Sequence, residues 1–258
     1  MPAMLFDLDG VLYEGDRAID GAADAVRWFV DNNIPHLFLT NTTSRPRSAL
    51  VDRLAGYGIH SRSDDFLTPP VAACQWLQEK KLKRIALFVP EQTAGEFSGF
   101  ELHSNENDTV DAVIIGDLGE QWDFTTMNHV FHLLVNNPQA ELIALGMTRY
   151  WQTASGQLQL DVGPMVKAFE YASDREAVVT GKPARTFFNA ARQLLGMDEL
   201  VMIGDDIRGD IEAAQKAGLK AILVRTGKFR ESDLDLGIRP DEVLDSVAEL
   251  PTWWQRAF

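Results

Sequence analysis

Short apolar runs alternate with segments of helical periodicity along this chain, and no other feature limits the possible folds as much. The runs lie at Met4–Phe6, His36–Leu39, Ala177–Val179, Leu200–Ile203 and Ala221–Val224. Between them, apolar residues recur at spacings of three and four, as on one face of a helix. Continuous apolar strands separated by helices predict an α/β protein whose parallel sheet is covered by helices on both faces.

The middle of the chain carries elements of its own. Strand-like runs and one helical segment occur at Ile85–Val89, Val110–Ile115, Glu141–Leu145 and Thr125–Val135. The polar stretch Thr153–Gly156 is typical of a turn. We therefore expect two domains, with residues 81–174 inserted into a first domain made of residues 1–80 and 175–258.

The composition excludes several kinds of partner and site. Lys and Arg number 24 and Asp and Glu number 38 among 258 residues, so the net charge is −14. This charge repels phosphate backbones and anionic lipid, and we expect neither a nucleic-acid nor a membrane partner. The single cysteine, Cys74, excludes an internal disulfide. The N-terminal residues do not resemble a signal peptide, and no run approaches the roughly 20 apolar residues of a membrane span, so we expect a soluble cytoplasmic protein.

Polar side chains follow four of the apolar runs where each run ends. They are Asp7 with Asp9, Thr40 with Asn41, Lys182, and Asp205 with Asp206. Ligands bind outside the carboxyl ends of the strands in an open parallel sheet, so we expect these side chains to meet in one crevice. Crowded carboxylates raise each other's pKa, and a bound cation relieves the conflict; an all-oxygen set favours Mg²⁺. A lysine and a hydroxyl beside such a metal predict phosphoryl transfer.

Four motifs, in this order, resemble those of the haloacid dehalogenase (HAD) superfamily. They are Asp7-Leu8-Asp9-Gly10-Val11-Leu12-Tyr13, Thr40-Asn41, Thr180-Gly181-Lys182-Pro183 and Gly204-Asp205-Asp206-Ile207-Arg208-Gly209-Asp210. The insertion between the second and third motifs resembles the C2-capped, NagD-like branch. Further segments, Leu160–Pro164 and Arg225–Lys228 among them, are similar to the phospholysine phosphohistidine inorganic pyrophosphate phosphatase and HDHD-type group. The resemblance implies a Rossmann-like HAD core with a C2-type α/β cap formed by the inserted domain.

The resemblance also implies a phosphatase mechanism. Asp7 would be the nucleophile that forms an aspartyl-phosphate, and Asp9 the general acid and later the general base. Mg²⁺ would be held by the carboxylates of Asp7 and Asp205 and by the backbone carbonyl of Asp9. Thr40, Asn41 and Lys182 would bind the transferring phosphoryl group.

Further residues are expected to act less directly. Asp210 and Asp206 would orient the metal ligands from behind, although Asp206 is equally expected to cap the next helix. The cap would close over the site and select the leaving group through four candidate residues, Arg149, Tyr150, Asp161 and Val162.

Three further segments have interpretations other than a role in catalysis. Thr40 and Asn41 could cap the next helix, a role that Thr43 or Ser44 could also take. Thr226-Gly227-Lys228 is not a Walker A loop, because residue 222 is isoleucine where that motif requires glycine. The acidic segment Glu231–Asp245 is expected to be a surface loop.

The function also has alternatives. One is a phosphotransferase that uses the same intermediate, and another is a non-catalytic binding protein that keeps the fold. Some members of the similar group carry serine in place of Asp9, and an aspartate there favours hydrolysis of phosphomonoesters. Pyrophosphate and phosphoramidates nevertheless remain candidate substrates. Related proteins are often dimers through the cap, so a homodimer is one arrangement to expect.

Overall fold

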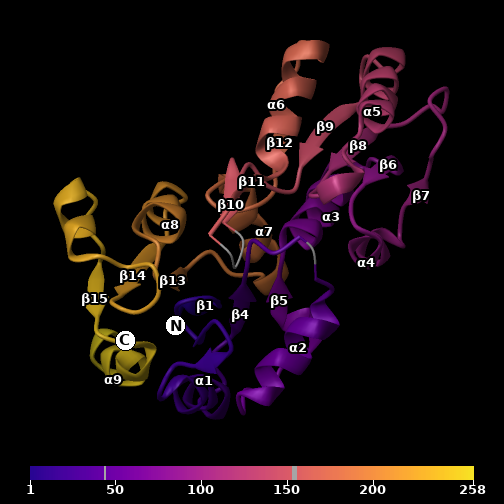
Figure 1. Ribbon diagram of the computed structural model, residues 1–258. Helices are drawn as coiled ribbons and strands as arrows, with labels where there is room; N and C mark the ends of the chain where they lie inside the picture. Colours follow the sequence, from indigo (N-terminus) through magenta and orange to yellow (C-terminus); the bar gives the residue numbers. More distant parts are fainter. Residues whose placement is uncertain (44, 153–155) are drawn as a thin grey trace. The chain divides into compact units, whose positions relative to one another are not determined.

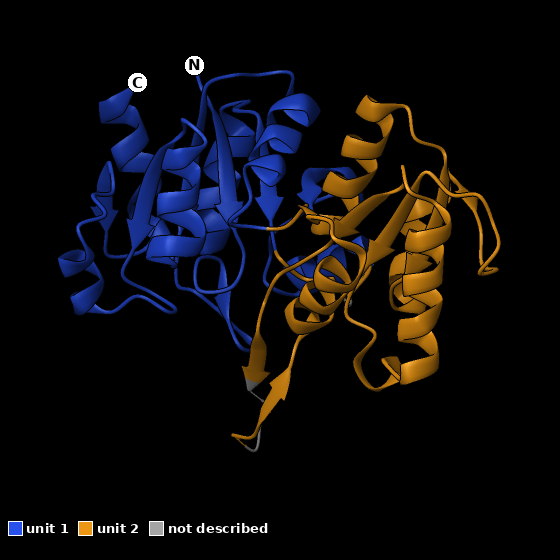
Figure 2. Cartoon of the chain, turned by 90° about the horizontal axis from the view of Figure 1, so that it is seen from above, with its two compact units in different colours: residues 1–40, 47–67, 182–258 blue, residues 41–46, 68–181 orange. Residues whose placement is uncertain are grey.

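The computed structural model describes residues 1–43, 45–152 and 156–258. The chain forms two compact units (Figure 2). Unit 1 consists of residues 1–40, 47–67 and 182–258, and unit 2, inserted within it, of residues 41–46 and 68–181. Each unit is built on its own parallel sheet, which confirms the expected fold class.

Unit 1 is built on a sheet of six parallel strands in the order β15-β14-β13-β1-β4-β5 (Figure 1). The strands are β1 (Ala3–Asp7), β4 (His36–Leu39), β5 (Phe66–Leu67), β13 (Leu200–Gly204), β14 (Lys220–Val224) and β15 (Glu242–Leu244). Every residue of β1 and β13 is buried, as continuous apolar strands in the middle of a parallel sheet should be. A short antiparallel pair, β2 (Tyr13–Glu14) and β3 (Arg17–Ala18), follows β1.

Helices cover both faces of this sheet. On the face that contains Phe6 lie the apolar sides of α1 (Ala22–Asp31), α2 (Arg47–Gly56) and α9 (Leu250–Ala257). Successive strand residues point to opposite faces, so the fully buried Leu5 and Met202 face the other side. We assign that side to α7 (Arg185–Leu195) and α8 (Ala213–Lys216), which contact each other, with α8 also contacting β14.

Unit 2 is a second α/β layer arrangement. Its sheet has five parallel strands in the order β12-β9-β8-β6-β7. They are β6 (Arg84–Phe88), β7 (Glu101–Leu102), β8 (Ala112–Ile115), β9 (Glu141–Ala144) and β12 (Val178–Val179). One face packs against α5 (Phe124–Asn136) and α6 (Val162–Ser173), and the other against α3 (Pro69–Lys80). The short helix α4 (Glu91–Ala94) and an antiparallel hairpin of β10 (Tyr150–Gln152) and β11 (Leu158–Leu160) complete the unit.

The boundaries of the units differ from the expected limits of the inserted domain, residues 81–174. Helix α3 belongs to unit 2 because its residues Ala73 and Leu77 pack in one apolar cluster with Ile85 and Ile114 of that sheet. Strand β12 also belongs there, because Val178 pairs with Ile143 of β9. The strand before Lys182 is therefore not a strand of the unit 1 sheet, contrary to our expectation.

Two other expectations change. Residues Glu242–Leu244, which we expected within a surface loop, form β15 at the edge of the unit 1 sheet. Helix α2 begins only at Arg47, too far along the chain for Thr40, Asn41 or Thr43 to be its N-cap. Ser44 and, except for Gly156, the turn expected at 153–156 lie outside the described residues. Across the residues that are described, no helix is both long and apolar enough to span a bilayer.

Candidate active site

Strand register brings the first group of expected site residues together within unit 1. Asp7, the last residue of β1, pairs with Leu39 of β4, so Thr40 lies one residue beyond it on the neighbouring strand. On the other side Phe6 pairs with Ile203, which places Asp205 just past the end of β13. Parallel strands end at the same edge, so the position of these polar residues follows from the apolar runs before them.

Lys182 binds two of the carboxylates. Its Nζ donates hydrogen bonds to Asp7 Oδ1 at 2.6 Å and to Asp210 Oδ1 at 2.7 Å. All three side chains are less than 10% exposed. Burial, together with the charge of Asp210, raises the pKa of Asp7 to about 8. Burial alone would lower the pKa of Lys182, but Asp210 and Asp7 outweigh it and raise that pKa above its usual range, so the lysine is a fixed cation.

Asp205 is enclosed by two loops of the same unit. Lys228 donates its backbone N–H to Asp205 Oδ2 at 2.7 Å, and Thr226 donates its hydroxyl to the carbonyl of Gly10 at 2.5 Å. A Cβ at Gly10 or Gly227 would lie within 2.1 Å of Asp205 Oδ2, and both glycines have positive φ. The space beside Gly10 is thus filled by Asp205. Burial raises the pKa of Asp205 to about 6.

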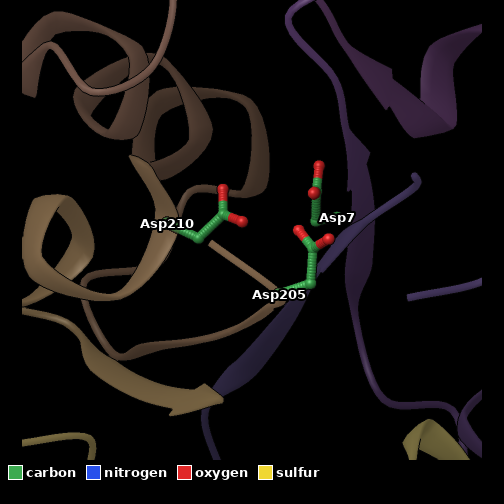
Figure 3. Close-up of side chains that lie close together, drawn as sticks. All are labelled: Asp7, Asp205 and Asp210. Carbon is green, nitrogen blue, oxygen red and sulfur yellow. The ribbon is translucent and has the colours of Figure 1, made fainter. Parts of the chain in front are cut away.

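Three carboxylates form a cluster that can hold a metal ion. Oxygen atoms of Asp7, Asp205 and Asp210 lie within 4.8 Å of one another (Figure 3). Asp205 Oδ1 is buried and accepts no hydrogen bond from the described residues. A buried carboxylate oxygen without a donor costs free energy of folding unless a cation binds it, so the cluster fits a metal ion. Asp210 is already engaged, because Oδ1 accepts from Lys182 and Oδ2 from the backbone N–H of Asp206 at 3.2 Å.

Asp9 is exposed, unlike the three buried aspartates of the cluster. Among the described residues, Tyr13 donates its hydroxyl to Asp9 Oδ2 at 3.4 Å. Tyr13 itself is 2% exposed, and burial, followed by the charge of Asp9, raises its pKa above the usual range. The tyrosine therefore stays protonated and remains a donor to Asp9.

The remaining core residues are placed as follows. Thr40 is buried in unit 1 at the end of β4. Asn41 belongs to unit 2, so the strand register of unit 1 does not fix its position relative to Asp7 and Asp205. Asp206 accepts the backbone N–H groups of Arg208 and Gly209 at 3.0 and 2.8 Å, which makes it the N-cap of a π-helical turn over Ile207–Glu212. The capping interpretation of Asp206 is thus correct.

The candidate specificity residues all lie in unit 2. Arg149 and Tyr150 are exposed at the start of β10. Asp161 is the N-cap of α6 and accepts the N–H of Val162 at 2.6 Å. Val162 is 2% exposed and packs in the apolar cluster of unit 2, so its side chain serves the fold. That leaves Arg149, Tyr150 and Asp161 as candidates.

Sequence reasoning missed the contribution of Thr226-Gly227-Lys228 to the site. The spacing of these residues does not match a Walker A loop, and we gave them no further role. They nevertheless follow β14, which ends at the same edge as β1 and β13. Their position after an apolar strand was the signal that could have identified them.

Comparisons with known proteins agree with this geometry. Residues 4–103 match the family model of haloacid dehalogenase-like hydrolases, and residues 179–250 match a second, HAD-hydrolase-like model. The chain is 39% identical over 253 residues to the human phospholysine phosphohistidine inorganic pyrophosphate phosphatase, covering 95% of this chain and 91% of the relative. Against the bovine haloacid dehalogenase-like hydrolase domain-containing protein 2, identity is 37% over 237 residues, with 91% and 88% covered.

A solved structure extends the likeness to three dimensions. NagD from Escherichia coli K-12 superposes with a TM-score of 0.84 at 26% identity, covering 96% of this chain and 98% of that one. Identity of this extent along almost the whole chain, together with buried aspartates and a lysine at the carboxyl edge of the sheet, leaves one assignment. The chain belongs to the haloacid dehalogenase-like hydrolases and is a phosphatase of that family.

Proposed function

We propose that the chain is a Mg²⁺-dependent phosphatase that hydrolyses small phosphate compounds through an aspartyl-phosphate on Asp7. The observation that carries the proposal is the buried cluster of Asp7, Lys182, Asp205 and Asp210. Lys182 donates hydrogen bonds to Asp7 and Asp210, whereas Oδ1 of Asp205 accepts none from the described residues. Such a cluster is poorly compensated until a cation binds, and it then presents positive charge to a phosphoryl group.

The metal would be held by Asp7, Asp205 and the backbone carbonyl of Asp9. When bound, it would lower the pKa of Asp7 and neutralise charge on the phosphoryl oxygens. Asp210 is excluded from direct ligation in this assignment because both of its oxygens already accept hydrogen bonds. Its role is to fix Lys182 and the backbone of Asp206.

The chain's own residues divide the reaction into two steps. In the first, a carboxylate oxygen of Asp7 bonds to phosphorus while the bond from phosphorus to the leaving oxygen breaks, and Asp9 protonates that oxygen. In the second, Asp9 takes a proton from water, the water oxygen bonds to phosphorus, and the bond to Asp7 breaks to release phosphate. Lys182 and Thr40, with Asn41 as a further candidate, bind the phosphoryl oxygens throughout.

The experiment measures phosphate release from p-nitrophenyl phosphate and a panel of small phosphate esters, pyrophosphate and phosphoramidates, with Mg²⁺ and with EDTA. We expect release only with the metal, and a loss of at least about a thousandfold in Asp7→Asn. Asp24→Asn is the matched control, because Asp24 lies on the exposed side of α1 and pairs only with Arg27 among described residues. Phosphate that appears on an added alcohol instead of in solution would indicate a phosphotransferase. Folded, metal-binding protein that releases nothing would favour the binding-protein alternative.

A further inference from the structure

A cavity of about 400 Å³ opens beside the metal cluster within unit 1. Its lining residues are Asp205, Asp206, Ile207, Arg208, Lys228, Arg230, Asp233 and Leu236. Asp205 is shared with the cluster, so a group bound in the cavity lies next to the reacting centre. The catalytic roles assigned above leave this cavity without a function.

Three cationic side chains line the cavity. Arg208 comes from the π-helical turn after β13, and Lys228 and Arg230 come from the loop after β14. Lys228 Nζ lies 3.8 Å from Asp206 Oδ2, at the limit of an ion pair. Within the described chain, no carboxylate lies within 4.0 Å of the guanidinium of Arg208 or Arg230.

The acidic residues of the cavity are already engaged by backbone donors. Asp206 Oδ1 accepts two N–H groups of the turn that it caps. Asp233 Oδ2 accepts the N–H of Arg230 at 2.8 Å, and Asp205 Oδ2 accepts that of Lys228. Their charges are therefore partly compensated without the guanidinium groups, which remain available to a ligand.

The cavity collects three of the 24 Lys and Arg side chains of the chain, beside three aspartates that backbone N–H groups already engage. The guanidinium groups of Arg208 and Arg230 repel each other, and an anion bound between them lowers that repulsion. Guanidinium groups bind phosphate and carboxylate through paired hydrogen bonds, whereas a single exposed arginine needs no ligand.

We propose that this cavity is a subsite for a second anionic group, a phosphate or carboxylate carried by the same substrate molecule whose phosphoryl group is transferred to Asp7. Arg208, Arg230 and Lys228 recognise that group and select substrates that carry a second anionic group besides the transferred phosphoryl group. The inference rests on the proposed phosphatase function and adds the substrate class.

A pair of matched substrates tests the subsite. Glycerol 3-phosphate and 3-phosphoglycerate differ by an alcohol in place of a carboxylate, so the ratio of their kcat/KM values measures recognition of the second charge. We expect 3-phosphoglycerate to be preferred. In the double variant Arg208→Gln/Arg230→Gln the preference should fall about tenfold, which corresponds to about 1.4 kcal/mol. Arg239→Gln, an exposed arginine outside the cavity, should keep the wild-type ratio.

A binding measurement separates failure of the subsite from failure of the phosphatase. Calorimetry with Mg²⁺ compares methylenediphosphonate with methylphosphonate, neither of which needs turnover. We expect the diphosphonate to bind more tightly to wild type and to lose that advantage in the double variant.

If the two phosphonates bind with equal affinity in both proteins, the subsite is overturned, even if phosphate release is normal. Two methylphosphonate molecules bound per chain, one of them lost in the double variant, would show a site for a separate anion and overturn the single-substrate proposal. If the wild type prefers the diphosphonate but releases no phosphate from any substrate, the phosphatase proposal is overturned and the subsite is not.

Discussion

Lys182 is the residue on which the charge balance of the site depends. It is the shared ion-pair partner of Asp7 and Asp210, and all three are buried. Lys182→Met keeps the length of the side chain and leaves two buried carboxylates without their cation. We expect the free energy of unfolding in EDTA at pH 9, above the pKa of about 8 of Asp7, to fall by about 3–5 kcal/mol, as for other broken buried ion pairs. Urea unfolding measures the change.

The same variant should recover as the pH falls, because protonated carboxyl groups no longer need the lysine. Lys216→Met is the control. Lys216 pairs with Glu212 on the surface, and its loss should change stability by no more than about 0.5 kcal/mol. An equal loss in both variants, or one that grows at low pH, would contradict the assigned role of Lys182.

At the scale of elements, the loop after β14 is expected to hold Asp205 in place. Gly227 has φ +67°, and a Cβ there would lie 2.1 Å from Asp205 Oδ2 and 2.5 Å from the Cα of Gly10. We expect Gly227→Ala to displace Asp205 and weaken Mg²⁺ binding at least about tenfold, as measured by calorimetry. Gly237→Ala is matched, since Gly237 has φ +78° with nothing within 4 Å of its Cβ position. The control incurs the backbone strain alone and should bind Mg²⁺ as wild type does.

A second element-scale prediction concerns the start of β8. The side chain of Arg84 binds Asp111, as do the N–H groups of Lys83 and Arg84, and together they lower the pKa of Asp111 from 3.8 to about 2. The folded state therefore binds fewer protons between these values, so the stabilisation is complete above about pH 4 and is lost as the pH falls toward 2. Asp111→Asn should lower the free energy of unfolding by about 1 kcal/mol at pH 7, a modest value because the pair is partly exposed.

Unfolding curves at pH 7 and at about pH 2 check this dependence on Asp111. The difference between variant and wild type should disappear at the lower pH. Asp174→Asn is the control within the same unit, because asparagine readily adopts the left-handed backbone found at this exposed position. A constant difference across the pH range would indicate that packing, and not the charge, stabilises the start of β8.

The sequence predicts elements better than it predicts their partners. The runs that became β1, β4, β13 and β14 were found because strands buried on both faces are continuously apolar. β15 escaped notice because an edge strand in an acidic segment is only partly buried. β12 was identified as a strand but placed in the wrong sheet, since nothing local in Val178 and Val179 distinguishes β9 from a strand of unit 1.

The site shows the same division. Asp7, Thr40 and Asp205 could be placed together because each lies at the carboxyl end of an apolar run, and the parallel strands formed by these runs end at one edge of the sheet. The hydrogen bond from Lys228 to Asp205 joins residues 23 apart, and it depends on how the loop after β14 folds back. Such loop contacts follow from tertiary packing and have no periodic pattern that reveals them.

For the whole molecule, the division into two units decides where metal binding acts. The three clustered carboxylates all belong to unit 1, and each unit has its own sheet and apolar core. A ligand stabilises only the structure that must be folded to bind it. Mg²⁺ at about 100 times its Kd should therefore stabilise unit 1 by about 2.7 kcal/mol, which slows amide exchange from its core about a hundredfold.

Hydrogen exchange with Mg²⁺ and with EDTA locates this effect. We expect protection to rise in β1 and β13 and to stay constant in β8 and β9 of unit 2, which serve as an internal control. Asp205→Asn should abolish the rise, because Asp205 supplies the buried oxygen that lacks a donor among the described residues. Equal slowing in both sheets would mean that the units open as one cooperative structure, and no slowing in either would remove the metal from the site. Since the effect is read from exchange and not from turnover, it tests the metal cluster independently of the substrate.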